Sequence, residues 1–133
     1  MGVSFFPSAA DVDRYRRLRA LSRVLSDRMV TTIPARAYYE IAEVLGFLRN
    51  GILVLETEDM TGVLADSCLY DWYDDGKNLI QRYAEKQPAK LGTDEVCLLD
   101  AYRGARYGVL DIKSAVKDAG VYCYDTLNQE ERS

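Results

Sequence analysis

The stretch from Thr61 to Glu85 constrains the fold of this chain more than any other part. It contains the single tryptophan, Trp72, and the densest group of carboxylates in the sequence. Apolar residues recur at helical spacing on both sides of Asp74-Asp75-Gly76, which predicts two helices. Gly76 can adopt a positive φ, so we expect these three residues to form a tight acidic corner between the helices. The chain before it is expected to form helices that pack onto this pair, and the chain after it is expected to form one more helix and a strand pair.

Helical spacing of apolar residues extends over most of the chain and predicts about five helices. Ser8, followed three residues later by Asp11, is a good start for the first of them. The segment Ile52–Leu55 is apolar but too short for periodicity to separate a strand from a buried connector. The predicted helices are Ala9–Met29, Pro34 to a stop at Asn50-Gly51, Glu56 to the acidic corner, the corner to Gln87-Pro88, and Thr93 to about Gly104.

From Tyr107 onward the apolar period changes to two, which is typical of β-strands. The pattern predicts a strand over 107–116, a turn at Lys117–Gly120 and a returning strand over Val121–Tyr124. The polar tail Asn128–Ser133 is expected to fray. In the first strand, one face is expected to carry Leu110, Ile112, Ser114 and Val116.

The expected fold is therefore mainly α, with a small antiparallel β-hairpin near the C-terminus, in the α+β class. No repeat, linker or low-complexity tract interrupts the chain, so we expect residues 1–133 to form a single domain. A lone hairpin is marginal in water, and its outer edges carry unpaired backbone groups. We therefore expect a further strand partner: Ile52–Leu55, a second copy of the chain, or sequence that this chain has lost.

The charge is distributed unevenly along the chain. Residues 1–50 hold eight Lys or Arg against five Asp or Glu, a net +3, and residues 51–133 hold nine against sixteen, a net −7. This balance argues against nucleic-acid binding, which needs a basic face to neutralise phosphates. The longest apolar run, Gly51–Leu55, is far too short to span a membrane.

Arginine and tyrosine supply the candidate partner-binding residues. Arg16, Arg19 and Arg23 of the first predicted helix form either a solvated face or a docking surface for an acidic partner or anionic lipid. Tyr122 and Tyr124 belong either to a recognition surface or to the boundary of a small core. Because both residue types are enriched at interfaces, we expect the chain to bind itself or another protein.

The sequence excludes several kinds of catalysis. It has no histidine, which removes Ser-His-Asp and Cys-His catalysis and histidine-based zinc sites. No phosphate-loop or dinucleotide pattern is present, so no cofactor is expected. Asp71, Asp74 and Asp75 are weak candidates for metal ligands, and in the alternative reading a metal-assisted hydrolase or phosphoryl-transfer enzyme would use them, with Lys77 or Arg82 holding the anion. We favour instead a non-enzymatic domain in which these carboxylates shape a helix corner.

Three cysteines occur far apart, at positions 68, 97 and 123, and none forms a Cys-x-x-Cys pair. Free cysteines in such contexts usually behave as small apolar residues. The expected location is the reducing cytoplasm.

Three short motifs resemble those of a group of uncharacterised bacterial proteins. The first lies within Leu69–Tyr83 and reads Asp71, then Asp75-Gly76-Lys77-Asn78; the others are Ala105-Arg106-Tyr107 and Asp125-Thr126-Leu127. The resemblance covers roughly the second half of the chain and implies a helical N-terminal half followed by a strand pair. Some proteins of this group end in a cysteine-rich SEC-C motif, which this chain lacks. The resemblance implies architecture and no activity.

Overall fold

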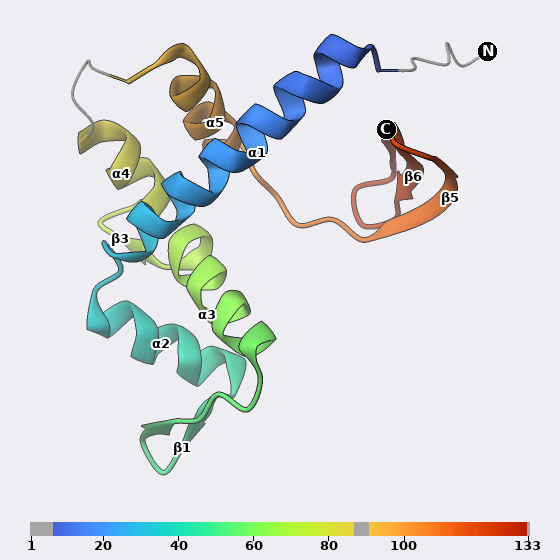
Figure 1. Ribbon diagram of the computed structural model, residues 1–133. Helices are drawn as coiled ribbons and strands as arrows, with labels where there is room; N and C mark the ends of the chain where they lie inside the picture. The colour runs from blue at the N-terminus through green and yellow to red at the C-terminus, as the bar shows by residue number, and fades with distance from the viewer. Residues whose placement is uncertain (1–6, 87–90, 133) are drawn as a thin grey trace. The chain divides into compact units, whose positions relative to one another are not determined.

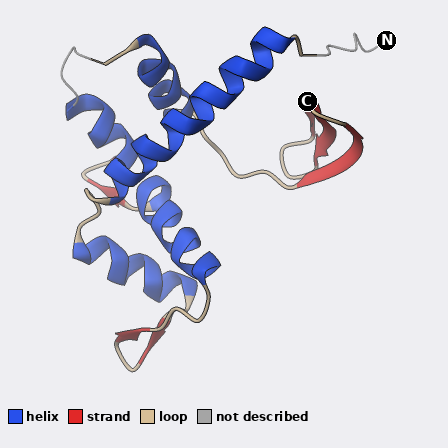
Figure 2. Cartoon of the chain, viewed as in Figure 1, coloured by secondary structure: helices blue, strands red, loops and turns tan. Residues whose placement is uncertain are grey.

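A computed structural model describes residues 7–86 and 91–132. The described chain contains five α-helices and three small antiparallel sheets, so the predicted α+β class is confirmed (Figures 1 and 2). The helices are α1 (Ala9–Val30), α2 (Ala35–Leu45), α3 (Glu58–Asp71), α4 (Leu79–Lys86) and α5 (Thr93–Arg103). The strands are β1 (Leu48–Arg49), β2 (Ile52–Leu53), β3 (Tyr73–Asp74), β4 (Lys77–Asn78), β5 (Leu110–Val116), β6 (Gly120–Asp125) and β7 (Glu130–Arg132).

The chain divides into two compact units, which we describe separately. One unit is Ala20–Arg103, and the other combines the described residues of Met1–Arg19 and Gly104–Ser133. That the whole chain behaves as a single domain stays a prediction.

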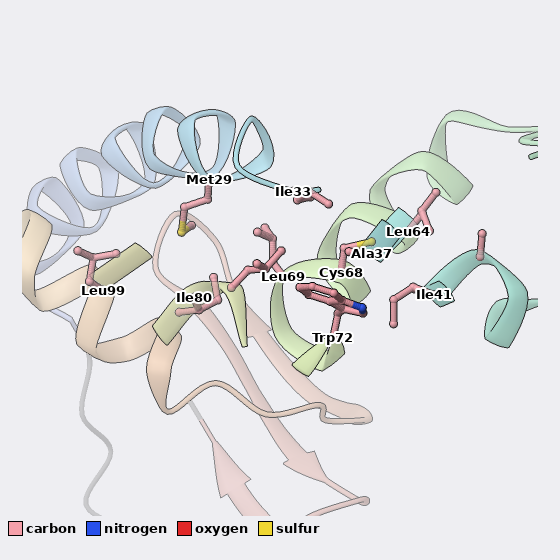
Figure 3. Close-up of a cluster of buried hydrophobic side chains, with 12 residues drawn as sticks. Met29, Ile33, Ala37, Ile41, Leu64, Cys68, Leu69, Trp72, Ile80 and Leu99 are labelled. Atoms are coloured by element: carbon pink, nitrogen blue, oxygen red, sulfur yellow. The ribbon is translucent and has the colours of Figure 1, made fainter. Parts of the chain in front are cut away.

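The helical unit is organised around a buried apolar cluster (Figure 3). Helix α2 packs against α3, α3 against α4, and α4 against α5. Met29 of α1 and Leu99 of α5 lie in the same cluster as residues of the central helices, and Trp72 is only 6% exposed. The cluster comprises Met29, Ile33, Ala37, Ile41, Ala42, Leu64, Cys68, Leu69, Trp72, Leu79, Ile80 and Leu99.

Helix α1 begins where the sequence predicted. Ser8 and Asp11 form a reciprocal cap: the Ser8 backbone N–H donates to Asp11 Oδ2 at 2.8 Å, and the Asp11 N–H donates to Ser8 Oγ at 3.2 Å. Helix α1 ends at Val30, one residue beyond the predicted Met29. The predicted stop of the fourth helix at Gln87-Pro88 lies outside the described residues.

Two tight hairpins replace features that the sequence analysis assigned to helices. Asn50-Gly51 does not end α2, which stops at Leu45 with Gly46 in the left-handed conformation; it turns between β1 and β2. Asp75-Gly76 likewise turns between β3 and β4 instead of forming a helix corner. In both pairs the two turn residues have positive φ, from 52° to 75°. Asn-Gly and Asp-Gly are the pairs that two-residue hairpin turns of this kind favour.

The second of these hairpins leads directly into α4 through another reciprocal cap. The Gln81 N–H donates to Asn78 Oδ1 at 2.9 Å, and the Asn78 N–H donates to Gln81 Oε1 at 3.0 Å. Asn78 Nδ2 also donates to the carbonyl of Tyr70 at the end of α3, at 3.1 Å. Asn78 therefore fixes the angle between α3 and α4.

The C-terminal sheet has three strands, in the order β5-β6-β7, instead of the predicted two. The tail expected to fray contains β7, which pairs with β6. The prediction that Ile52–Leu55 could pair with the C-terminal hairpin is wrong, since Ile52 and Leu53 pair with Arg49 and Leu48.

A bulge in β5 changes which side chains share a face. The register shifts between Ile112 and Ser114, leaving Lys113 as the extra residue. As a result Leu110 and Ile112 lie on the face opposite to Ser114 and Val116, and the predicted common face is wrong. No strand of the described chain pairs with the outer edge of β5. Because a bulge and a lysine both discourage further pairing, this edge gives little reason to expect a second copy there.

Candidate functional site

Three exposed arginines share one face of α1, as the sequence predicted. All three are exposed: Arg16, Arg19 and Arg23. Arg19 and Arg23 follow Arg16 by three and seven residues, which places the three within about 60° of the helix circumference. We call them the arginine face. Within the residues the structure describes, none of the three forms an ion pair or a side-chain hydrogen bond.

The arginines that follow α1 behave differently, because every one of them has a carboxylate partner. Arg49 pairs with Glu56 at 2.8 Å, and Arg106 pairs with Glu130. The paired set comprises Arg36, Arg49, Arg82, Arg103, Arg106 and Arg132. The charges of the arginine face, like those of Arg17 and Arg28 on the same helix, are therefore not compensated by an ion pair within the described residues.

The candidate metal ligand Asp74 lies between two guanidinium groups. Its two carboxylate oxygens are each 3.4 Å from an arginine nitrogen, one from Arg36 and the other from Arg82. Arg82 also donates to the backbone carbonyl of Asp74. These contacts balance the charge of Asp74 from within the protein, and they occupy the arginine that the enzyme alternative assigned to an anion.

The other two candidate ligands are placed differently from Asp74. Asp71 is the exposed last residue of α3, and Asp75 is an exposed turn residue with φ of 52°. The described residues contain no group of three His, Cys, Asp or Glu side chains placed to hold a metal ion. Lys77, the other proposed anion ligand, pairs with Glu85 at 2.8 Å.

Trp72 links α2 to the end of α3. Its indole N–H donates to Glu40 Oε2 at 2.6 Å, and the Arg36 guanidinium lies 5.1 Å from the indole ring centroid. Arg36 also approaches Glu40 Oε1 at 3.3 Å. The only tryptophan therefore serves packing and orientation between two helices.

Tyr122 and Tyr124 lie together on one face of β6 and are half-buried. They stand opposite Ser114 and Asp111 of β5. The structure thus groups the three arginines on one helix face and the two tyrosines on one sheet face.

A shallow apolar hollow in the helical unit was missed at the sequence level. Ala35, Tyr38, Tyr39 and Leu53 line it, and its volume is about 280 Å³. Burial raises the pKa of Tyr38. Sequence periodicity could place the tyrosines on α2, but it could not show that β2 returns beside them.

Asp125 is a buried carboxylate that holds the C-terminal sheet together, a role the sequence did not reveal. It is 1% exposed and accepts hydrogen bonds from the backbone N–H groups of Val109, Leu127 and Asn128 at 3.1–3.3 Å. The side-chain amide of Asn128 also donates to it at 2.8 Å, and Arg132 Nε lies 3.3 Å away. These donors, the Asn128 side chain foremost, hold the pKa of Asp125 below its usual value.

Gly108 packs directly against this carboxylate. A Cβ atom at this position would lie 2.7 Å from Asp125 Oδ2, so a side chain cannot be added without displacing the Asp125 carboxylate. The Asn128 amide also donates to the carbonyl of Tyr107 at 2.8 Å. The Ala105-Arg106-Tyr107 and Asp125-Thr126-Leu127 motifs are therefore linked by hydrogen bonds through Asn128.

None of the three cysteines forms a disulfide. Cys68 and Cys123 are buried, while Cys97 is exposed. Burial raises the pKa of Cys68 to about 11, which keeps this thiol protonated and unreactive at neutral pH.

The arrangement of the described chain is that of an α+β protein with a helical core and a small antiparallel sheet. Residues 9–133 match the model of a family of unknown function, DUF7986, and the chain belongs to this family. No curated protein and no solved structure matched the chain. No helix in the described residues is long and apolar enough to cross a membrane.

Proposed function

We propose that this chain is a non-enzymatic protein-interaction domain and that it binds an acidic protein surface through the arginine face of α1. The observation that carries the proposal is the contrast between the unpaired Arg16, Arg19 and Arg23 and the six ion-paired arginines at 36–132. A guanidinium group recognises a carboxylate through two parallel hydrogen bonds, so exposed arginines in a row suit an acidic partner.

The helix that carries the arginine face also favours binding over a purely solvated role. Tyr15 stands four residues before Arg19, on the flank of the arginine face, and is 60% exposed. Tyrosine and arginine are both among the residue types enriched in interface contacts. Tyr122 and Tyr124 remain proposed contact residues of the C-terminal sheet, since both keep part of their surface accessible.

The enzyme alternative gains no supporting observation. Asp74, the central carboxylate of that alternative, already forms ion pairs with Arg36 and Arg82. The described residues contain no group of three His, Cys, Asp or Glu side chains, with or without Asp71 and Asp75, that could hold a metal ion. We also propose a reducing, cytoplasmic location, because the three cysteines are far apart in the sequence and none of them forms a disulfide.

Comparative affinity capture tests the proposal. The tagged chain is expressed in its own host cells beside Arg16→Glu/Arg19→Glu and a control, Arg17→Glu/Arg28→Glu. The control changes two other exposed arginines of the same helix, about 140° away from the arginine face. We expect an acidic protein, which can be the untagged chain itself, to be retained by the wild type and the control and lost from the arginine-face variant. Equal retention by all three would refute the proposal.

A further inference from the structure

Helix α3 carries an acidic counterpart to the arginine face. Asp59 and Asp66 are exposed, and like Arg16 and Arg23 they are seven residues apart on one helix face. Both pairs therefore span about 10.5 Å along their helices. Neither aspartate has an ion pair or a side-chain hydrogen bond in the described chain, so this pair is also uncompensated. We call it the acidic row.

The surroundings of the two surfaces are compatible with a helix-on-helix contact. Gly62 lies between Asp59 and Asp66 and offers no side chain, so another helix can approach α3 closely there. Val63, beside the acidic row, is 49% exposed, and Tyr15, beside the arginine face, is 60% exposed. Each surface thus combines matched charges with one exposed apolar side chain.

We infer that the acidic partner of the arginine face is a second copy of this chain, whose acidic row faces Arg16 and Arg23. This inference rests on the proposed function and names its partner. Charge complementarity carries it, because the two arginines and the two aspartates have the same spacing on their helices and neither pair has an ion partner within the described residues. Two copies can therefore satisfy both surfaces with no other protein.

The contact joins two different surfaces, so each copy offers one donor surface and one acceptor surface. Repetition of the contact produces either a closed oligomer or a longer assembly. Because the paired charges are exposed at the rim of such a contact, its affinity falls with ionic strength.

Sedimentation velocity on the purified full chain tests the inference with two charge-reversal variants, Arg16→Glu/Arg23→Glu and Asp59→Arg/Asp66→Arg. We expect the wild type to self-associate at micromolar concentration in about 0.02 M NaCl and to dissociate toward monomer in about 0.5 M NaCl. Each variant alone should associate at least about tenfold more weakly, because its two like-charged surfaces repel. Arg17→Glu/Arg28→Glu should associate like the wild type. Far-UV circular dichroism verifies that every variant is folded.

Mixing the two reversal variants provides the decisive arm. The arginine face of Arg16→Glu/Arg23→Glu is negative and is complementary to the positive row of Asp59→Arg/Asp66→Arg. The other surface of each variant keeps its original charge, and these two surfaces are also complementary. An equimolar mixture should therefore recover association. A monomeric wild type at all concentrations, or a mixture that does not recover, would overturn the inference. If the wild type is monomeric while capture from cells still depends on the arginine face, only the self-association is wrong and the proposed function stands. Binding of the arginine face to anionic vesicles or DNA in place of protein would overturn both.

Discussion

Replacing Trp72 with phenylalanine should destabilise the helical unit by about 2.5–3 kcal/mol. The substitution removes the indole N–H that donates to Glu40 Oε2 at 2.6 Å, and a hydrogen bond to a charged group contributes about 1.5–3 kcal/mol. The carboxylate is part-exposed, so the lower half of that range applies. The smaller ring also leaves space at a position only 6% exposed, which costs roughly a further 1 kcal/mol.

Urea unfolding followed by far-UV circular dichroism measures this loss, since Trp72 is the only tryptophan and the variant has no indole fluorescence. Glu40→Gln is the matched control. Its amide oxygen still accepts from the indole, but the variant loses the charge that strengthens this hydrogen bond and also the Arg36 ion pair, whose side chains are 62% and 54% exposed. Such a pair contributes at most about 1 kcal/mol. A Trp72→Phe variant within about 0.5 kcal/mol of the wild type would refute the role assigned to this hydrogen bond.

Three further predictions concern the C-terminal sheet and the thiols. Gly108→Ala should disorder the sheet, because its Cβ would lie 2.7 Å from Asp125 Oδ2, whereas Gly92→Ala meets nothing within 4 Å; amide exchange of the strands compares the two. Because hydrogen bonds lower the pKa of Asp125 in the folded state, its contribution is complete above the ordinary aspartate pKa of about 3.9 and is lost as the pH falls through the lowered value. An Asp125→Asn variant should therefore lose most of the acid dependence of sheet unfolding, and an unchanged pH profile would contradict this. Cys68, with a pKa of about 11, should resist a thiol reagent at neutral pH until the protein unfolds, while Cys97 reacts in the native state; equal native rates would refute the assignment.

The helices were predictable because their apolar residues repeat at the helical period and their caps are local. Ser8 and Asp11 form the cap that their spacing indicates. The errors at Asn50-Gly51 and Asp75-Gly76 have a common cause: each pair can end a helix or close a hairpin, and flanking strands of two residues are too short to show a period of two.

The C-terminal sheet depends on interactions that the sequence pattern does not contain. The bulge at Lys113 reverses the faces of β5 beyond Ile112, so a count of alternating residues fails there. Strand β7 is polar throughout and lacks the apolar alternation of a strand. It is fixed by pairing with β6 and by contacts from Arg132 to Asp125 and Glu130, which link residues that only the fold brings together.

The candidate site was predictable in part. Helical spacing alone places Arg16, Arg19 and Arg23 on one face. Which arginines lack partners could not be predicted, because the ion pairs of Arg36 with Asp74 and of Arg106 with Glu130 join distant parts of the sequence. Asp74, a weak candidate metal ligand by sequence, has its charge balanced by Arg36 and Arg82.

The most direct test of the arginine face measures stability and binding on the same protein. Arg16→Glu/Arg19→Glu is unfolded by urea and is also used for affinity capture, beside the wild type and Arg17→Glu/Arg28→Glu. Since Arg16 and Arg19 are exposed and have no ion partner in the described chain, we expect an unfolding free energy within about 0.5 kcal/mol of the wild type together with loss of the bound acidic protein. A stability loss of more than about 2 kcal/mol would show that these arginines belong to the fold's own interactions, and undiminished capture would show that the arginine face is not the docking surface.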